Sequence, residues 1–180
     1  KMKKILILML TIFSISLTAQ EINWMTLEEA VEAQKTAPKK IFMDAYTIWC
    51  GPCKMLDKNT FHNKDVVDYV NKNYYAVKFN AEGNEVINFK GATYTNPNFN
   101  PNTSGRNSSH QLSAYLGISA YPTLIYLDEE ANLIAPITGY KTPSQLELFL
   151  KLFASDDFKK LTSDGDWKNY QASFKSEFND

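Results

Sequence analysis

The sequence is poor in the residues that build metal and cofactor sites. Its 180 residues include only two cysteines and two histidines. A structural zinc site takes four ligands, and His62 and His110 lie far apart in the chain, in polar surroundings. A surface or helix-capping role is therefore expected for each histidine. No metal site and no cofactor is predicted.

An excess of charge of either sign is also missing. Lys and Arg number 19 and Asp and Glu number 20, so the formal net charge is −1. No electrostatic footprint for nucleic acid or for an anionic membrane is present, and nucleic acid is not expected as a partner. A composition that is 44% hydrophobic and 13% aromatic suits one compact domain with a real core.

One apolar run stands apart from the rest of the chain. It covers residues 5–17, follows Lys3 and Lys4, and gives way to polar residues near position 20. The run is too short for a comfortable membrane span, and its flanks are typical of a secretory signal peptide, which we predict over residues 1–20. An uncleaved N-terminal anchor is the alternative. An exported protein, with no stable membrane association after cleavage, would reside where disulfides persist.

Helix starts are marked by capping residues. Thr26 and Thr142 each open a capping box. Asn63 is expected to cap another helix, and Pro52 to occupy the first turn of one. A short helix is predicted over residues 111–116.

Short apolar runs predict buried strands between these helices. They cover residues 40–46, 74–79, 123–127 and 133–138. Pro136 suits only an edge strand, because it cannot donate a ladder hydrogen bond. The layout of strand, helix, strand, helix, hairpin and helix predicts an α/β fold with a mixed sheet.

Two segments depart from this rhythm. Residues 82–109 are rich in Asn, Pro, Ser and Thr, which predicts a long loop insertion. Residues 155–180 carry Trp167, Tyr170, Phe174 and Phe178 at helical spacing. We interpret this tail as an extra helix that covers the core, with a docking surface for a partner as the alternative.

Both cysteines lie in "WCGPCK", residues 49–54. If Pro52 opens a helix, Cys50 lies at its N-terminus, where free N–H groups and the helix dipole stabilise a thiolate. Cys53 lies a turn further in, less accessible to solvent, and stays protonated until it attacks a mixed disulfide at Cys50. A redox dithiol is favoured over a structural staple, because a bridge that closes so short a loop adds little stability.

These features resemble the thioredoxin superfamily. "WCGPCK" matches the family's active-site sequence residue for residue. Asp44 lies six residues before Cys50, where thioredoxins keep a buried aspartate, and Lys78 in "AVKFN" lies where they keep its lysine partner. "ISAYPTLIYLD" resembles the segment with the cis-proline, which would be Pro122.

The resemblance implies a secreted bacterial thioredoxin-like protein in the periplasm. The stretch after the cysteines is similar to the soluble C-terminal domain of the membrane reductant transporter that supplies electrons to that compartment. The implied fold is a central mixed β-sheet flanked by helices over residues 21–154. The 82–109 insertion and a helical C-terminal extension over residues 155–180 are additions to it.

The resemblance also implies roles for particular residues. Cys50 attacks, Cys53 resolves, Asp44 shuttles a proton and Lys78 tunes it, since burial raises the proton affinity of a carboxylate and a counter-charge limits that shift. The alternative for Asp44 is a helix or turn cap. The substrate site would be framed by Trp49, Gly51, Pro52, Tyr121 and Pro122.

A cis bond before Pro122 would bring the backbone against the sulfurs, beside an edge that pairs with an extended substrate. An ordinary trans proline at a strand start is the alternative. Because loops that follow parallel strands gather at the active edge of such sheets, we also hypothesise that residues 90–109 overhang Cys50 and restrict substrates.

The sequence therefore predicts a thiol–disulfide oxidoreductase that acts on disulfides of exported proteins. Gly-Pro between the cysteines resembles the reducing members of the family, which favours a reductant or isomerase supplied with electrons by a membrane-bound donor. Oxidation is the alternative direction. A non-catalytic binding module, which presents the long loop and the aromatic tail to a partner, is the alternative function.

Overall fold

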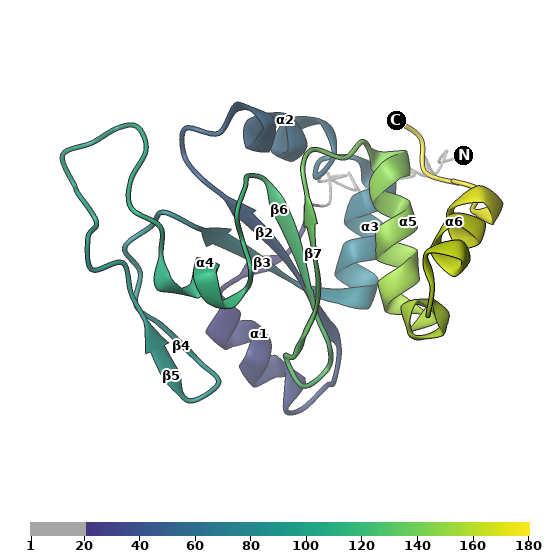
Figure 1. Ribbon diagram of the computed structural model, residues 1–180, viewed down its shortest axis with the longest axis horizontal. Helices are drawn as coiled ribbons and strands as arrows, with labels where there is room; N and C mark the ends of the chain where they lie inside the picture. Colours follow the sequence, from purple (N-terminus) through teal and green to yellow (C-terminus); the bar gives the residue numbers. More distant parts are fainter. Residues whose placement is uncertain (1–20) are drawn as a thin grey trace, which may run out of the picture.

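The computed structural model describes residues 21–180, so the predicted signal peptide over residues 1–20 lies outside the described residues. A five-stranded sheet with the order β1-β3-β2-β6-β7 forms its centre (Figure 1). The strands are β1 (Trp24–Met25), β2 (Lys40–Tyr46), β3 (Tyr74–Asn80), β6 (Thr123–Leu127) and β7 (Leu133–Thr138). β3 runs parallel to β1 and β2, whereas β6 is antiparallel to β2 and β7. The predicted mixed sheet is confirmed, with Pro136 on the edge strand β7.

The helices begin where the capping residues predict. The helices before the tail are α1 (Leu27–Gln34), α2 (Gly51–Asn59), α3 (Lys64–Asn73), α4 (Gln111–Tyr115) and α5 (Pro143–Ala154). Both capping boxes, at Thr26 and Thr142, are formed. The Asn63 side chain accepts hydrogen bonds from the first turn of α3. Within residues 21–180 no helix has the length and apolar character that a membrane crossing requires.

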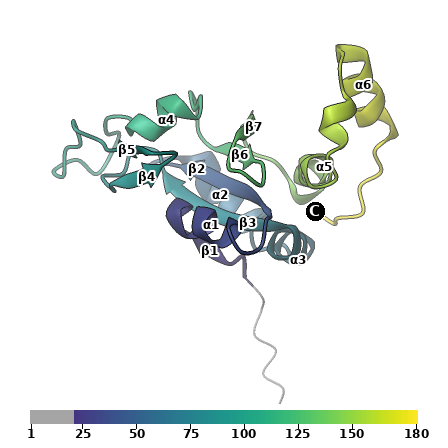
Figure 2. The same cartoon turned by 90° about the horizontal axis from the view of Figure 1, so that it is seen from below.

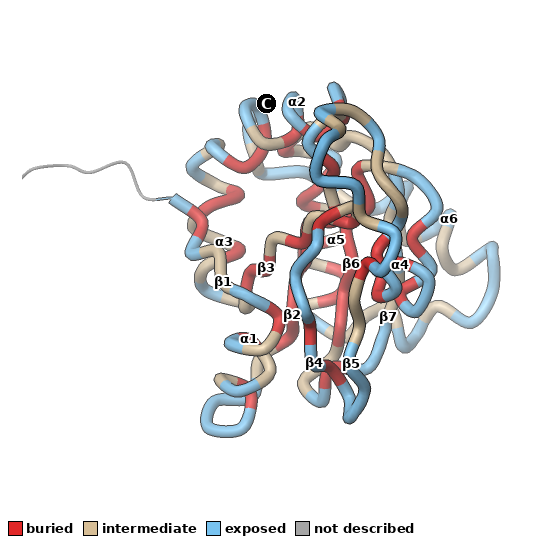
Figure 3. Tube along the Cα trace, turned by 90° about the vertical axis from the view of Figure 1, so that its left-hand side faces the viewer, coloured by how far each residue is buried: buried red, intermediate tan, exposed pale blue. Residues whose placement is uncertain are grey.

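Two hydrophobic clusters fill the two faces of the sheet. On one face, α1 and α4 pack through Leu27 and Leu112 against Met43 of β2 and its neighbours. On the other face, α2, α3 and α5 pack through residues such as Leu56 and Leu150 against Phe42 and the strands beside it. Figure 1 shows α3 and α5 side by side, away from α1 and α4. The fully buried strands β2 and β6, red in Figure 3, therefore form the rigid centre.

The sheet topology brings three chain segments to one edge. The parallel strands β2 and β3 both end there, at Tyr46 and Asn80. The antiparallel strand β6 begins there, because Thr123 lies opposite Ala45. The segment that carries the cysteines, the long insertion and the segment that ends in Pro122 must therefore meet at this edge.

Residues 82–109 were predicted to form one long loop. The structure shows that this insertion also contains regular structure. It contains a two-stranded hairpin of β4 (Ile87–Phe89) and β5 (Ala92–Tyr94). Lys90 and Gly91 make the turn with φ of 51° and 77°, the left-handed values that a two-residue hairpin favours. Strands of three residues are too short to give a periodic pattern, and the two-residue strand β1 escaped prediction for the same reason. In Figure 1 the hairpin points away from α2, so the middle of the insertion does not approach the cysteines.

The tail carries the predicted extra helix. After a 3-10 turn, η1 (Asp157–Lys160), α6 (Asp164–Ser173) lies outside α5 (Figure 2). The rings of Trp167 and Phe149 lie 5.9 Å apart between these helices. Helical geometry ends before Phe178, which turns back and contacts Tyr69 of α3 at 5.9 Å between ring centroids. The tail thus covers α5 and reaches α3.

A buried carboxylate fixes the end of the tail. Glu147 of α5 has no exposed surface, and its Oε2 accepts hydrogen bonds from the Glu177 and Phe178 backbone amides at 2.8 and 2.9 Å and from the Ser176 hydroxyl. Its Oε1 lies 2.7 Å from the Lys151 ammonium. Burial raises the pKa of Glu147, but these bonds outweigh burial and hold its pKa below the ordinary value.

We predict that Glu147→Gln frees the tail and lowers the free energy of unfolding by about 2–4 kcal/mol, because buried donors lose a charged acceptor. Urea unfolding measures the loss, and protease cleavage after residue 173 reports release of the tail. The matched control is Glu177→Gln, which removes an exposed partner of the same Lys151 and should cost less than about 1 kcal/mol. Equal effects of the two variants would contradict this account.

Candidate active site

The two cysteines lie at the start of α2. Cys50 is the N-cap residue and Pro52 lies in the first turn, as the motif predicts. Cys50 and Cys53 form a disulfide. The Cys53 backbone N–H donates a hydrogen bond to Cys50 Sγ over 3.1 Å. A helix amide is therefore directed at the sulfur of Cys50, in the position where it would stabilise negative charge.

Both cysteines are enclosed in this oxidised state. Cys50 exposes 2% of its surface and Cys53 exposes 4%. The predicted contrast, an accessible Cys50 and a shielded Cys53, is wrong for the disulfide form. The two residues are buried to nearly the same extent while the bond is present. Any partner must therefore displace or pass the groups that surround the disulfide.

Asp44 is buried behind the cysteines at the end of β2, with 1% of its surface exposed. Burial raises the pKa of its carboxyl to about 7, with Lys78 opposing the shift and Asp57 adding to it. A carboxyl whose pKa lies near neutrality exists in both protonation states, which is the property that proton transfer requires. The alternative role, a helix or turn cap, has no support, because no hydrogen bond to Asp44 from a backbone amide is present within residues 21–180.

Lys78 is shared between two carboxylates. It lies opposite Asp44 in the register of β2 and β3, and its Nζ is 3.8 Å from the Asp44 carboxylate. Its nearer partner is Asp57 of α2, with which it forms a hydrogen-bonded ion pair. The ammonium also lies over aromatic rings, including those of Trp24 and Tyr46 at 5.1 and 5.5 Å. Asp57 thereby draws the counter-charge away from Asp44.

Sequence reasoning missed Asp57, although a signal was present. It follows Cys53 by four residues and therefore lies on the same face of α2. A spacing of four on a helix that begins at the cysteines would have directed attention to it.

A cavity of about 230 Å³ joins these groups. It is lined by Asp44, Cys53, Asp57, Lys78, Tyr46, Thr47, Ile48 and Lys54. Within residues 21–180, Asp44 Oδ1 has no hydrogen-bond partner, and neither has the Thr47 hydroxyl. The cavity therefore offers a polar path between the Cys53 side of the disulfide and the carboxyl of Asp44.

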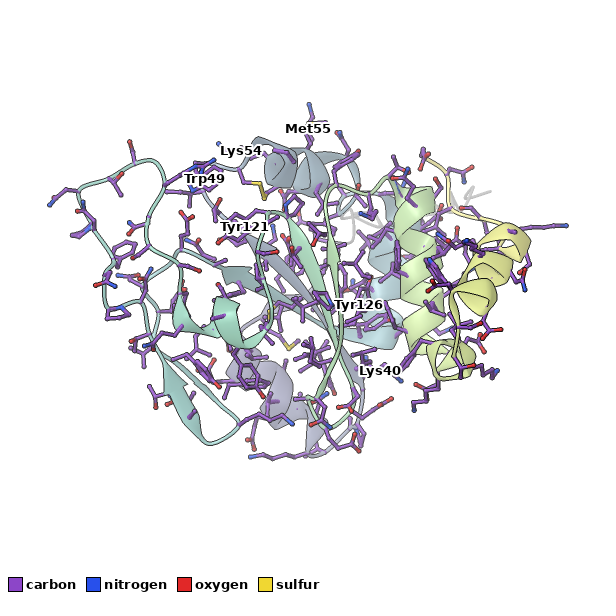
Figure 4. The ribbon with its side chains drawn as sticks, in the orientation of Figure 1. Lys40, Trp49, Lys54, Met55, Tyr121 and Tyr126 are labelled. Atoms are coloured by element: carbon purple, nitrogen blue, oxygen red, sulfur yellow. A yellow bond between two sulfur atoms is a disulfide. The ribbon has the colours of Figure 1, made fainter. Side chains whose placement is uncertain are left out.

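The predicted substrate-binding residues surround the disulfide. The peptide bond between Tyr121 and Pro122 is cis. The Tyr121 ring meets the Trp49 ring edge-on, with centroids 6.0 Å apart, and both side chains lie beside the disulfide in Figure 4. Gly51 and Pro52 are exposed on the first turn of α2. The structure thus brings together at one edge all the residues that the sequence nominated.

The insertion supplies two further residues that the sequence analysis missed. Glu82 accepts a hydrogen bond from the Trp49 indole N–H over 2.7 Å, and the Arg106 guanidinium carbon lies 4.4 Å from the Trp49 ring centroid. No local pattern marks these residues, because their partner lies far from them in the chain.

The two histidines have the structural roles that were predicted. His62 is exposed, and its Nδ1 lies 2.7 Å from the Asp57 carbonyl. His110 caps α4 by accepting a hydrogen bond from the Leu112 amide at 3.1 Å.

The fold and the CxxC disulfide at a helix start define a thioredoxin-fold protein. The family model described as a thioredoxin-like domain matches residues 27–154. The chain therefore belongs to the thioredoxin-like domain family. A comparison with curated proteins finds no matching sequence.

Solved structures agree with this fold. A thioredoxin-fold protein from Helicobacter pylori aligns with a TM-score of 0.57 and 16% identity over 75% of this chain and 81% of its own. A candidate disulphide isomerase from Bacteroides thetaiotaomicron aligns with a TM-score of 0.51 and 25% identity over 75% and 94%. The C-terminal domain of DsbD from Neisseria meningitidis aligns at 0.46 and 16% over 71% and 90%, a likeness too low to carry an argument.

The raised pKa of Asp44 predicts a pH-dependent cost to stability. Between about pH 4 and pH 7 the unfolded chain releases a proton that the folded protein retains, so stability falls as pH rises through this window. Relative to Asp44→Asn, the wild type should lose about 4 kcal/mol across the window. Urea unfolding of the oxidised proteins at several pH values measures the difference. Asp68→Asn, at a carboxylate on the surface of α3, is the control for the loss of one negative charge, whereas an Asp44→Asn curve parallel to that of the wild type would contradict the prediction.

Proposed function

We propose that the protein is a thiol–disulfide oxidoreductase that exchanges disulfides with exported proteins. The observation that carries the proposal is the disulfide at the start of α2, whose Cys50 sulfur accepts the Cys53 amide while a cavity connects Cys53 to buried Asp44. A nucleophile that is stabilised as a thiolate, a second thiol and a proton acceptor are the parts that dithiol exchange requires. A structural bridge would need none of the cavity, the cation or the carboxyls.

The reduced protein acts in two steps. The Cys50 thiolate attacks one sulfur of a substrate disulfide, forms a mixed disulfide and releases the other substrate sulfur as a thiolate, which takes up a proton. Cys53 then loses its proton and attacks Cys50 Sγ, which forms the Cys50–Cys53 bond and releases the second substrate thiolate. The substrate disulfide gains two electrons and the protein dithiol loses two.

Asp44 and Lys78 serve the second step. Asp44 accepts the Cys53 proton through the cavity, because its pKa near 7 leaves a large share of carboxylate at neutral pH. Lys78 limits how far burial raises that pKa, and its ion pair with Asp57 weakens the limit. Asp57 is thus a positioning residue for the cation.

Substrates approach between Trp49 and the cis-proline segment. Ser119 and Ala120, which precede the Tyr121–Pro122 bond, are exposed. Their backbone offers an edge that an extended peptide can pair with, so that the substrate sulfur reaches Cys50 beside Pro122.

Reduction or isomerisation is the direction that we propose. The Gly-Pro pair between the cysteines favours it, and so does the likeness, at 25% identity, to the candidate disulphide isomerase from Bacteroides thetaiotaomicron. Export to the bacterial periplasm follows from the apolar run near the N-terminus, and a membrane-bound donor would return electrons to the disulfide after each cycle.

Reduction of insulin by dithiothreitol tests the exchange. We expect the wild type to accelerate precipitation of the insulin B chain and Cys50→Ser to match the thiol-only rate. Cys53→Ser should retain the nucleophile but lack the resolving thiol, and therefore accumulate a mixed disulfide that is visible on a non-reducing gel. Equal activity of wild type and Cys50→Ser would instead support a non-catalytic binding module.

The reduction potential tests the direction. Equilibration of the Cys50–Cys53 pair with glutathione buffers, read by mass spectrometry, should give a value between about −270 and −200 mV, the range of reducing dithiols. A value above about −150 mV would exclude the reductant and would identify an oxidase.

A further inference from the structure

Residues 96–109, which we call the cap, form a closed loop of their own beside the active edge. The Asn96 side chain is 7% exposed and donates hydrogen bonds to the Gly83 carbonyl at 3.0 Å and the Ser108 carbonyl at 2.7 Å, which joins the two ends of the loop. Within the loop, the Asn107 side chain accepts a hydrogen bond from the Asn100 amide at 2.9 Å and donates one to the Asn100 carbonyl at 2.8 Å. The cap is therefore held in shape by amide groups and not by an apolar core.

One carboxylate oxygen ties the cap to the active site. Glu82 Oε2 accepts hydrogen bonds from the Trp49 indole N–H and from the Asn107 backbone N–H, each over 2.7 Å. Arg106, at the neighbouring position of the cap, lies over the Trp49 ring at 4.4 Å. Trp49 directly precedes Cys50 in the chain. We call Glu82 and Arg106 the latch.

The latch explains why Cys50 is buried on the side of the cap but can still be reached from another side. Cys50 is 2% exposed, and its preceding residue is pinned between the cap and Tyr121. Ser119 and Ala120, which precede Tyr121 in the chain, are exposed, which leaves an approach on the Tyr121 side of Trp49. A disulfide in an extended peptide or a small molecule can enter from that side, whereas a disulfide on a folded surface would collide with the cap.

We propose that the cap determines the substrate range of the exchange: Glu82 and Arg106 hold it against Trp49, so that Cys50 reacts faster with disulfides of small molecules and extended peptides than with those on folded proteins such as insulin. The proposal rests on the proposed function. It narrows the predicted overhang of residues 90–109 to residues 96–109, because the hairpin strand Ala92–Tyr94 lies away from α2 in Figure 1.

Arg106→Ala is the variant that opens the latch. Stopped-flow rates of the reduced protein, without added thiol, are compared for oxidised insulin and for the small aromatic disulfide DTNB. The ratio of the insulin rate to the DTNB rate should rise at least about threefold, as expected when one exposed cation–π contact no longer holds the closed form. Arg106→Lys keeps a cation and should fall between wild type and Arg106→Ala.

Lys90→Ala is the matched control. Lys90 also belongs to the insertion, but it bonds to Glu130 and Asn132 in the turn between β6 and β7 and does not contact Trp49. Both of its rates should equal those of the wild type. An unchanged ratio in Arg106→Ala, or an equal fall of both rates, would overturn the proposal.

Alkylation of Cys50 tests whether the cap limits access, independently of disulfide exchange. In a Cys53→Ser background, Cys50 is labelled with iodoacetamide and, in parallel, with a maleimide carrying a polyethylene glycol chain of several kilodaltons. Arg106→Ala should accelerate the large reagent relative to the small one. If wild type exchanges with neither insulin nor DTNB, the proposed function fails, while the labelling ratio still decides whether the cap limits access. If Arg106→Ala leaves the ratio of the two labelling rates unchanged, the proposed role of the cap is wrong even when exchange is fast.

Discussion

The hydrogen bond from the Cys53 amide to Cys50 Sγ is the contact on which the proposed chemistry depends. It exists because α2 begins directly at Cys50, with Pro52 in the first turn, where its missing N–H costs no helical bond. The position of that helix follows from the sheet. β2 is buried along nearly its whole length, so its end at Tyr46 is fixed, and only a few residues separate it from the helix start. The buried centre of the sheet therefore fixes the position of Cys50 Sγ.

The same rigidity forces three charges together beneath the disulfide. Asp44 and Lys78 face each other because β2 and β3 are in parallel register, and Asp57 follows from the helical repeat after Cys53. One cation for two carboxylates is an unequal arrangement, and the exposed carboxylate has the closer contact. Burial, which Lys78 opposes only in part, raises the pKa of the Asp44 carboxyl to about 7, and this raised pKa lowers stability at neutral pH. This cost beside a cysteine pair supports the proposed role of Asp44 in proton transfer.

The sequence predicted those parts of the molecule that local chemistry determines. Capping boxes at Thr26 and Thr142, the Asn63 cap and the apolar runs gave the helices and central strands, since each signal lies within a few residues of its effect. The motif and the family resemblance nominated the candidate site residues, which the fold brings to one edge of the sheet. The hairpin escaped because strands of three residues leave no periodic trace. The contact between Glu82 and Trp49 escaped because it spans 33 residues and is created only when β2 and β3 end at the same edge.

The chain adds two segments to the core fold, and they are attached by different forces. The tail joins α5 and α3 through partly buried aromatic rings and through the buried carboxylate of Glu147. The cap is shaped by its own asparagine amides and meets Trp49 through polar and cation–π contacts of Glu82 and Arg106. Contacts of the first kind contribute more to stability, whereas a few exposed polar contacts open at small cost. A segment that must admit some partners and exclude others requires the second kind, and it is the cap, not the tail, that lies against the residue preceding Cys50.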